Sequence, residues 1–305
     1  MIELVDDAAR VTLAPAIGGS IVAFTWHGRP VLRPTPASAV DEANVRLASC
    51  YPLVPLSNRI RNAALTFAGR TWPLARNFGS HPHAIHGVGW QRPWQVEEAL
   101  TTRARLSFVH DARGPNASAW PWPFRATQTF ELHGGSAGGA GGALLGVTLT
   151  LENVAAEAFP FGLGWHPFFA KSAVARLAFR ASGVWENDAT QLPVRHVPVP
   201  PDWKFDAMRP LANSVLDNVF THWHGVATLE DPASSLHTTL AADRACRNLV
   251  VYRPPAADFI ALEPVTHETD AFNRAAEGAA DTGMRTLAPG AAFSCTMRIA
   301  ASALD

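Results

Sequence analysis

Charge is scarce in this sequence, and lysine is almost absent. Charged residues make up 17% of the 305 residues, the formal net charge is -1, and Lys171 and Lys204 are the only lysines. No basic stripe and no block of like charges occurs along the chain. A nucleic-acid-binding surface is usually marked by such a stripe, and a solvated tail by such a block. We therefore expect no nucleic-acid partner and no charged tail.

Cysteines and long apolar runs are scarce as well. Cys50, Cys246 and Cys295 lie far apart, which does not fit a disulfide framework and suits a reducing compartment. The first residues, MIELVDDAARVTLAP, contain early acidic residues and lack the apolar segment of a secretory signal peptide. No apolar stretch approaches the length that spans a bilayer. The sequence predicts a cytoplasmic protein without a membrane partner.

Long helices are excluded by 24 prolines and 22 glycines spread along the chain. Short β-like runs recur between turn signals instead. Residues 9–34 predict three strands with turns at Gly18-Gly19 and His27-Gly28, and residues 64–76 predict a hairpin around Gly69. Only residues 38–48 and 270–281 have weak helical patterns. We expect an all-β fold, a large sandwich or barrel with few short helices, in one domain over residues 1–305.

A glycine-rich segment, HGGSAGGAGG at residues 133–142, has the composition of a phosphate-binding loop. It lacks the lysine and the following helix that such a loop requires. Two alternating β-like runs, residues 125–132 and 143–154, flank it. The segment is therefore predicted to be a connection between two strands.

One histidine ends an apolar stretch that contains two glycines, FGLGWHPFFA at residues 161–170. In an extended strand, the bulky apolar residues would face the core, while Gly162, Gly164 and His166 would face the other side. Glycine in a strand often marks the close approach of a ligand or of another backbone. Pro167 favours an extended conformation at His166. The pattern predicts a cleared patch with a fixed imidazole at its edge.

Two further polar segments interrupt apolar sequence. In YPLVPLSNRIRNA, residues 51–63, Asn58 and Arg59 lie between apolar neighbours, and Arg59 is either a surface charge or a half-buried group that needs an anion or several acceptors. In HPHAIHGVGW, residues 81–90, the three histidines suggest a metal, but no nearby cysteine or carboxylate completes a ligand set. We predict no metal site. Glycines after His86 indicate space for a ligand, so His86 is predicted to contact substrate.

The last segment, DFIALEPVTHETDAFN at residues 258–273, places Glu263 at the end of an apolar strand. In strand geometry Ile260 and Leu262 face one way, and Ala261 and Glu263 face the other. Glu263 is either a rim carboxylate paired with an arginine or a general base whose pKa an apolar surround raises. In LDNVF, at residues 216–220, Asp217 either binds hydroxyl groups or caps a turn.

Together the segments PLSNRI, HAIHGVGW, GWHPFF, LDNVF and ALEPVTHETDAFN resemble, in order, the motifs of the aldose 1-epimerase (mutarotase) family, over essentially the whole chain. The resemblance implies a large antiparallel β-supersandwich with a sugar site on its concave face. It implies His166 as general acid, Glu263 as general base and His86 as an aid at the ring oxygen. It also implies that Asn58, Arg59 and Asp217 contact or position the sugar.

The motifs depart from those of the galactose mutarotases at HGVGW and HPFF, and the chain looks more like a less characterised bacterial branch of the family. The pattern around Arg59 favours an unphosphorylated hexose. A hexose 6-phosphate, bound through Arg59, Arg61 or Arg76, is an alternative. A carbohydrate-binding protein without catalysis and a glycoside hydrolase or lyase, which mostly needs two carboxylates, are rival readings.

The implied reaction opens the sugar ring as O5 takes a proton and O1 loses one, and recloses it on the other face of C1. An imidazolium suits the acid because its pKa lies near the working pH, and a carboxylate suits the base. The reaction requires no metal, nucleotide or redox group, so no cofactor is predicted. The expected partner is a small-molecule sugar, and the expected protein is a monomer or a homodimer.

Overall fold

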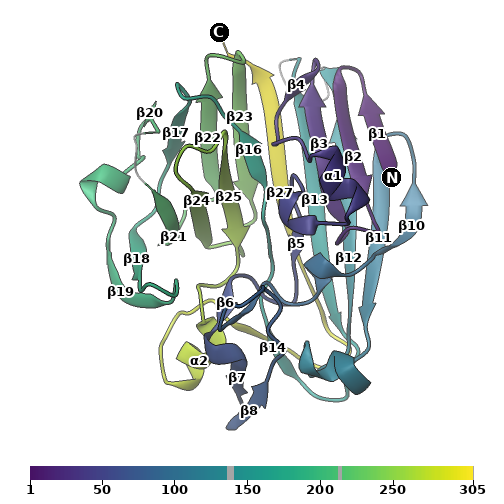
Figure 1. Ribbon diagram of the computed structural model, residues 1–305, viewed down its shortest axis with the longest axis vertical. Coiled ribbons are helices and arrows are strands. Elements are labelled where there is room, and N and C mark those ends of the chain that lie inside the picture. The colour runs from purple at the N-terminus through teal and green to yellow at the C-terminus, as the bar shows by residue number, and fades with distance from the viewer. Residues whose placement is uncertain (136–140, 212–214, 305) are drawn as a thin grey trace.

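The computed structural model describes residues 1–135, 141–211 and 215–304, and strands dominate them. Most strands run along the longest axis of the molecule, with helix α2 (Ala271–Ala276) and strands β7 (Ala64–Phe67) and β8 (Arg70–Pro73) at one end and the C-terminus at the other (Figure 1). All pairings between its strands are antiparallel. The predicted all-β class is confirmed.

Two large sheets contain most of the described strands. The nine-stranded sheet has the order β10 (Gln95–Ala99), β11 (Arg103–His110), β12 (Phe124–His133), β13 (Ala143–Asn153), β27 (Ala292–Ala303), β23 (Leu236–Ala242), β22 (Val226–Asp231), β17 (Arg176–Phe179), β20 (Arg209–Pro210). The eight-stranded sheet has the order β19 (Pro193–Pro198), β18 (Gly183–Asn187), β21 (Leu216–Thr221), β24 (Asn248–Arg253), β25 (Phe259–Val265), β15 (Gly164–Trp165), β5 (Pro52–Leu53), with β16 (Phe168–Ala170) also paired to β25.

Smaller sheets complete the part of the chain that the structure describes. Their strands are β1 (Ile2–Asp6), β2 (Ala9–Ala14), β3 (Ser20–Trp26) and β4 (Arg29–Pro30) in one sheet, and the pairs β6 (Arg59–Ile60) with β9 (Ala84–Ile85), β7 (Ala64–Phe67) with β8 (Arg70–Pro73), and β14 (Phe159–Phe161) with β26 (Arg285–Leu287). The predicted turns at Gly18-Gly19 and His27-Gly28 and the hairpin around Gly69 are all confirmed.

The two predicted helical segments are present but shorter than their sequence patterns. Helix α1 (Ala37–Asp41) is followed by a separate 3-10 turn, η1 (Val45–Leu47), because Ala43 adopts a left-handed φ of 52° between them. Helix α2 ends before Gly278, whose φ is 91°. Further 3-10 turns are η2 (Arg61–Ala63), η3 (Gly89–Gln91), η4 (Gly114–Ser118) and η6 (Pro201–Trp203).

The main core is built by strict alternation along the long strands. Every second residue of β13 is buried, from Ala143 to Asn153, and β27 continues the pattern with Cys295, Met297 and Ile299. Strand β25 differs because both of its faces are buried. Ile260 and Leu262 join the main core, whereas Ala261 and Val265 join a second apolar cluster with Tyr51, Phe168 and Val250.

The glycine-rich connection lies between two paired strands, as its flanks predicted. Strands β12 and β13 form a continuous antiparallel ladder that begins at His133 and Leu144. Residues 136–140 of the predicted connection lie outside the described residues.

Candidate active site

His166 and Glu263 face each other within the eight-stranded sheet. β15 pairs with β25 at Gly164, and β16 pairs with β25 at Phe168, in the same register on either side of His166. That register places His166 opposite Glu263 on the face of the second apolar cluster. Nε2 of His166 lies 3.2 Å from Oε1 of Glu263. The sheet itself therefore brings together two groups almost a hundred residues apart.

Both groups are buried, with side-chain exposures of 9% for His166 and 3% for Glu263. Burial, with a smaller effect from the charges of Arg33 and Arg59, lowers the pKa of His166 to about 3. Burial, reinforced by Asp217, raises the pKa of Glu263 well above its usual range. Burial thus favours the uncharged form of each group. This corrects the expected imidazolium with a near-neutral pKa, because the depth of burial is a tertiary property.

His86 is fixed by reciprocal hydrogen bonds with the backbone of Asn58. The Asn58 N–H donates to Nδ1 of His86 at 3.0 Å, and the His86 N–H donates to the carbonyl oxygen of Asn58 at 2.8 Å. Because Nδ1 accepts, the ring proton of the neutral imidazole is assigned to Nε2. Burial, followed by the charge of His166, lowers the pKa of His86 well below its usual value. His86 is thus a neutral hydrogen-bond donor.

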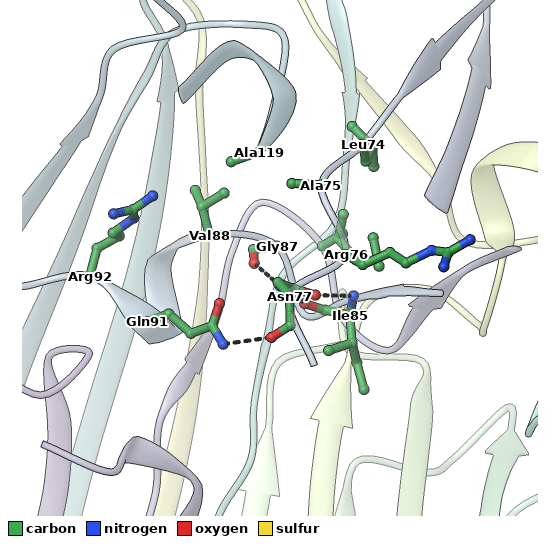
Figure 2. A pocket seen from close by; sticks show the side chains of 12 residues that line it. Leu74, Ala75, Arg76, Asn77, Ile85, Gly87, Val88, Gln91, Arg92 and Ala119 are labelled. Carbon is green, nitrogen blue, oxygen red and sulfur yellow. Dashed lines mark hydrogen bonds between the residues drawn. The ribbon is translucent and has the colours of Figure 1, made fainter. Parts of the chain in front are cut away.

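The loop that carries His86 is held by the side chain of Asn77 (Figure 2). Nδ2 of Asn77 donates to the carbonyl oxygens of Ile85 and Gly87 at 2.7 and 3.1 Å, and its Oδ1 accepts from the Ile85 N–H at 2.9 Å. Both neighbours of His86 are fixed in this way. His86 itself has a φ of 58°, a conformation uncommon for a residue with a side chain. Sequence reasoning missed Asn77, which no motif marked.

Arg59 and Asp217 form a second polar pair beside these groups. Strand β6, which begins with Arg59, pairs with β9 directly before His86, so Arg59 and His86 are neighbours. Nη1 of Arg59 donates to Oδ1 of Asn58 at 2.9 Å, and Nη2 lies 3.8 Å from Oδ2 of Asp217. Burial raises the pKa of Asp217, and the charge of Arg59 opposes this shift.

One cavity of about 500 Å³ brings together all six candidate residues from the sequence. His86, His166 and Glu263 line it together with Asn58, Arg59 and Asp217. Its other lining residues include Arg33, Arg46, Tyr51, Phe168 and Tyr252. The Tyr51 ring packs 4.8 Å from the His166 ring and 5.3 Å from the Trp90 ring, measured between centroids. Sequence reasoning missed Arg33, Arg46 and Tyr51, although Tyr51 begins the segment that contains Asn58.

The glycines near the histidines mark close approaches of other parts of the chain, which was one of the two predicted possibilities, and not space for a ligand. A Cβ atom on Gly162 would lie 1.7 Å from the ring of His267, and one on Gly164 would lie 2.8 Å from the carbonyl oxygen of Pro264. A Cβ atom on Gly87 would meet the Val54 carbonyl oxygen at 2.5 Å. The space is thus taken by the protein and not by a ligand. The stretch 161–170 is also divided between β14, β15 and β16, and β25 continues past Pro264.

The remaining histidines of the motifs have structural hydrogen bonds. Nδ1 of His83 accepts from the Asn62 N–H at 2.9 Å. His267 uses both ring nitrogens: Nδ1 donates to the carbonyl oxygen of Glu268 at 2.7 Å, and Nε2 accepts from the Ser57 N–H at 3.0 Å. Over residues 1–135, 141–211 and 215–304, no group of three His, Cys, Asp or Glu side chains could hold a metal ion. In the same ranges no helix is long and apolar enough to cross a bilayer.

Comparison with known sequences places these residues in a family. The family model for aldose 1-epimerase matches residues 1–300. The uncharacterized protein YphB of Escherichia coli (strain K12) is 31% identical over 292 residues, which are 92% of each chain. A second Escherichia coli protein, the uncharacterized YihR, is 23% identical over 265 residues, 84% of this chain and 81% of its own.

Solved structures share the fold. A crystal structure of an Escherichia coli K12 protein, described as a candidate aldose 1-epimerase, superposes with a TM-score of 0.87 at 27% identity over 99% of both chains. A galactose mutarotase-like protein from Clostridium acetobutylicum superposes with a TM-score of 0.85 at 16% identity, over 99% of this chain and 94% of its own. The predicted mutarotase-like architecture is confirmed. The match over residues 1–300 shows that the chain belongs to the aldose 1-epimerase family, an isomerase family.

Proposed function

We propose that the cavity catalyses the interconversion of the α and β anomers of an aldose by opening and reclosing its ring. The observation that carries the proposal is the 3.2 Å contact between Nε2 of His166 and Oε1 of Glu263 inside a cavity of sugar-binding size. O1 and O5 of a pyranose are bonded to the same carbon, so an acid and a base that serve both oxygens must lie close together. The whole chain acts as one domain in this proposal.

The proton balance of the reaction matches a pair that stays neutral overall. With the ring closed, the Glu263 carboxylate takes the O1 proton while the protonated His166 gives its proton to O5. The open aldehyde then faces a neutral imidazole and a carboxylic acid, which is the form that burial favours in the free protein. Rotation about the C1–C2 bond and reversal of both transfers give the other anomer. Direct transfer between Oε1 and Nε2 restores the ion-pair form when sugar binds.

His86 and the Arg59–Asp217 pair assist in this scheme. The Nε2–H of His86 donates to the ring oxygen as negative charge develops there. Arg59, Asn58 and Asp217 bind sugar hydroxyls and set the orientation of C1 over the pair. General acid and general base catalysis each contribute about 10²–10⁴-fold, or together roughly 5–11 kcal/mol of barrier. That is sufficient for ring opening, so no covalent intermediate is required.

The rival functions require different roles for His166, Glu263 and Asp217. A binding protein without catalysis has no need for His166 and Glu263 in contact. A glycoside hydrolase needs a second free carboxylate, and the candidate Asp217 already lies beside Arg59. Polarimetry on freshly dissolved α-D-glucose and α-D-galactose tests the proposal, since the protein should accelerate the approach to the equilibrium rotation. Sugar binding without acceleration favours the binding protein, and release of an aryl alcohol from an aryl glycoside favours the hydrolase.

A further inference from the structure

Two arginines line the cavity without a carboxylate partner. Arg33 and Arg46 both contribute to its lining, and no ion pair with Asp or Glu forms at either residue within the described part of the chain. Arg59, in contrast, lies 3.8 Å from Asp217. Arginines on protein surfaces are often unpaired without consequence. Whether Arg33 and Arg46 form a binding site therefore depends on the contacts of their side chains.

Arg33 is held between aromatic rings. Its Cζ lies 3.9 Å from the centroid of Phe168 and 4.5 Å from that of Phe259, and Nη2 donates to the carbonyl oxygen of Ala48 at 2.9 Å. Its Nε is buried and has no hydrogen-bond partner. A guanidinium has five N–H donors, and one neutral carbonyl leaves most of them unsatisfied, while the carboxylate that acts on the charge, Asp258, forms no ion pair with it. Half-buried positive charge of this kind is stabilised by rings and, more strongly, by an anion.

Arg46 lies on η1, within the same segment, residues 33–47, that begins with Arg33. Its side chain is exposed and its Cζ lies 4.3 Å from the centroid of the Phe78 ring, which also lines the cavity. The stacking keeps the charge at the cavity mouth, where the Arg46 charge acts to lower the pKa values of Tyr51 and Tyr252 against their burial. One segment thus supplies two positive charges to the cavity, and both act on Tyr51 and Tyr252.

The Arg33 charge is separated from His166 by an aromatic ring. The His166 ring stacks on Phe168 with centroids 4.4 Å apart, and the Arg33 guanidinium covers the same ring at 3.9 Å. Two groups that both lie over one ring at such distances occupy its opposite faces. A ligand that places C1 at His166 and Glu263 would therefore meet Arg33 through another part of its structure.

The cavity has an excess of positive charge. Arg33, Arg46 and Arg59 contribute three charges, Asp217 offsets that of Arg59, and Glu263 is matched by His166, since the pair adds no net charge in either form that the proposed function uses. Hydroxyl groups of a neutral sugar could accept hydrogen bonds here but could not balance two charges. We propose that the substrate is an aldose with an anionic substituent away from C1, a phosphate, sulfonate or carboxylate, which Arg33 and Arg46 bind. This inference rests on the proposed function and names its substrate class.

Two of the three arginines named from sequence for a phosphate, Arg61 and Arg76, do not line the cavity, and the third, Arg59, lies beside Asp217. Arg61 pairs with Asp270 and Glu277, away from the cavity, and Arg76 lines the neighbouring cavity of Figure 2. Arg76 is exposed and therefore offers a matched control, because its replacement removes a surface arginine that does not line the cavity.

Catalysed anomer exchange by the full-length protein, followed by NMR exchange spectroscopy with the spontaneous rate subtracted, tests the proposal on four sugars. They are glucose, glucose 6-phosphate, glucuronate and the 6-sulfonate analogue of glucose, which share one pyranose. We expect kcat/KM for at least one anionic sugar to exceed that for glucose by about tenfold or more at low ionic strength. High salt should reduce this ratio, and the sugar with the largest ratio identifies the anion.

Variants of Arg33 and Arg46 test whether these two arginines cause the preference for anionic sugars over glucose. Arg46→Met and Arg33→Met retain side-chain bulk and should each lower the ratio of anionic to neutral kcat/KM by about fivefold or more, whereas Arg76→Met should leave it unchanged. Equal or better turnover of glucose than of all three anionic sugars overturns the proposal. The same ratio in Arg46→Met as in Arg76→Met also overturns it.

Binding measured by calorimetry separates this inference from the proposed function. If no sugar shows catalysed exchange, the proposed function fails, yet the anion site still predicts that the three anionic sugars bind more tightly than glucose and lose this advantage in Arg46→Met. If exchange is catalysed but none of the anionic sugars binds more tightly than glucose, the proposed function stands and the anion site fails.

Discussion

Two regions of the molecule each bury a histidine beside a glutamate, and they differ in how the hydrogen bonds are completed. His267 uses both ring nitrogens, and Glu268 accepts from Nε1 of Trp185 at 2.5 Å and lies 3.1 Å from Arg274. In the other region, Nδ1 of His166 has no partner, and Nε2 faces the Glu263 carboxyl group.

The comparison separates structural from reactive buried groups. Burial alone does not distinguish the regions, because it lowers the pKa of His267 to about 4 and that of His166 to about 3. It also raises the pKa of both glutamates. What differs is the histidine: both ring nitrogens of His267 are hydrogen-bonded within the protein, whereas Nδ1 of His166 is not, although Glu268 also lines a cavity, of about 230 Å³. Nε2 of His166 faces the Glu263 carboxyl group in the cavity that all six candidate residues line.

The largest expected difference between the regions is in turnover. Glu263→Gln and His166→Asn should each lower kcat by about 10²–10⁴-fold, because each removes one partner of the proton transfer, and should leave the melting temperature close to that of the parent. Polarimetry and thermal unfolding measure the two effects. Glu268→Gln, the matched change in the other region, should keep most of the turnover. Comparable losses for Glu263→Gln and Glu268→Gln would remove the distinction.

The second prediction concerns stability. His267→Ala removes the acceptor of the Ser57 N–H and opens a cavity beside Gly162, so it should lower the free energy of unfolding by about 2–4 kcal/mol. Chemical denaturation measures this change. His166→Asn is the control and should cost less stability, because it gives up no backbone partner of the ring. A larger loss of stability for His166→Asn than for His267→Ala would contradict this assignment.

The third prediction concerns Asn77, which does not line the cavity but fixes the backbone on both sides of His86. Asn77→Ala releases the backbone on both sides of His86 and should lower kcat about tenfold with little change in KM, because the donor to the ring oxygen loses its position. The variant Gln91→Ala removes a neighbouring hydrogen bond to Asn77 and serves as control. In a His86→Ala background, Asn77→Ala should have no further effect on kcat. Additive losses would mean that Asn77 acts on something other than His86.

The smallest expected effect is a pH dependence of stability in the region of His267 and Glu268. Burial raises the pKa of Glu268 to about 7, so between its usual pKa and 7 the folded state holds a proton that the unfolded state has lost. This contribution is complete at low pH and is lost as the pH rises through 7, by about 1 kcal/mol between pH 6 and 7. Unfolding of the parent and of Glu268→Gln at both pH values measures the difference, which the variant should lack. An unchanged pH dependence in the variant would assign it to another group.

Much of the fold followed from patterns of period two and from turn residues. The strands at residues 9–34 and the hairpin at Gly69 were predictable because their determinants are local. The lengths of the helices were not, since a left-handed Ala43 ends one of them.

The site was predictable to the extent that its residues interrupt apolar sequence. His166, Glu263 and Arg59 stood out for that reason, and they line one cavity. Asn77, Arg33 and Arg46 could not be found in the same way, because their surroundings are ordinary and only the tertiary arrangement brings them to the site. The glycines were recognised as points of close approach, but which group approaches them depends on strand register.

The position of His166 between two strands that share one neighbour has a consequence for how such proteins diversify. The spacing of the proton donor and acceptor is a property of the β-ladder and survives any change in the surrounding loops. Residues 33–47 lie outside that ladder and can exchange Arg33 or Arg46 without disturbing it. Under the proposed function and the proposed anion site, proton transfer and choice of sugar therefore depend on separate parts of the polypeptide.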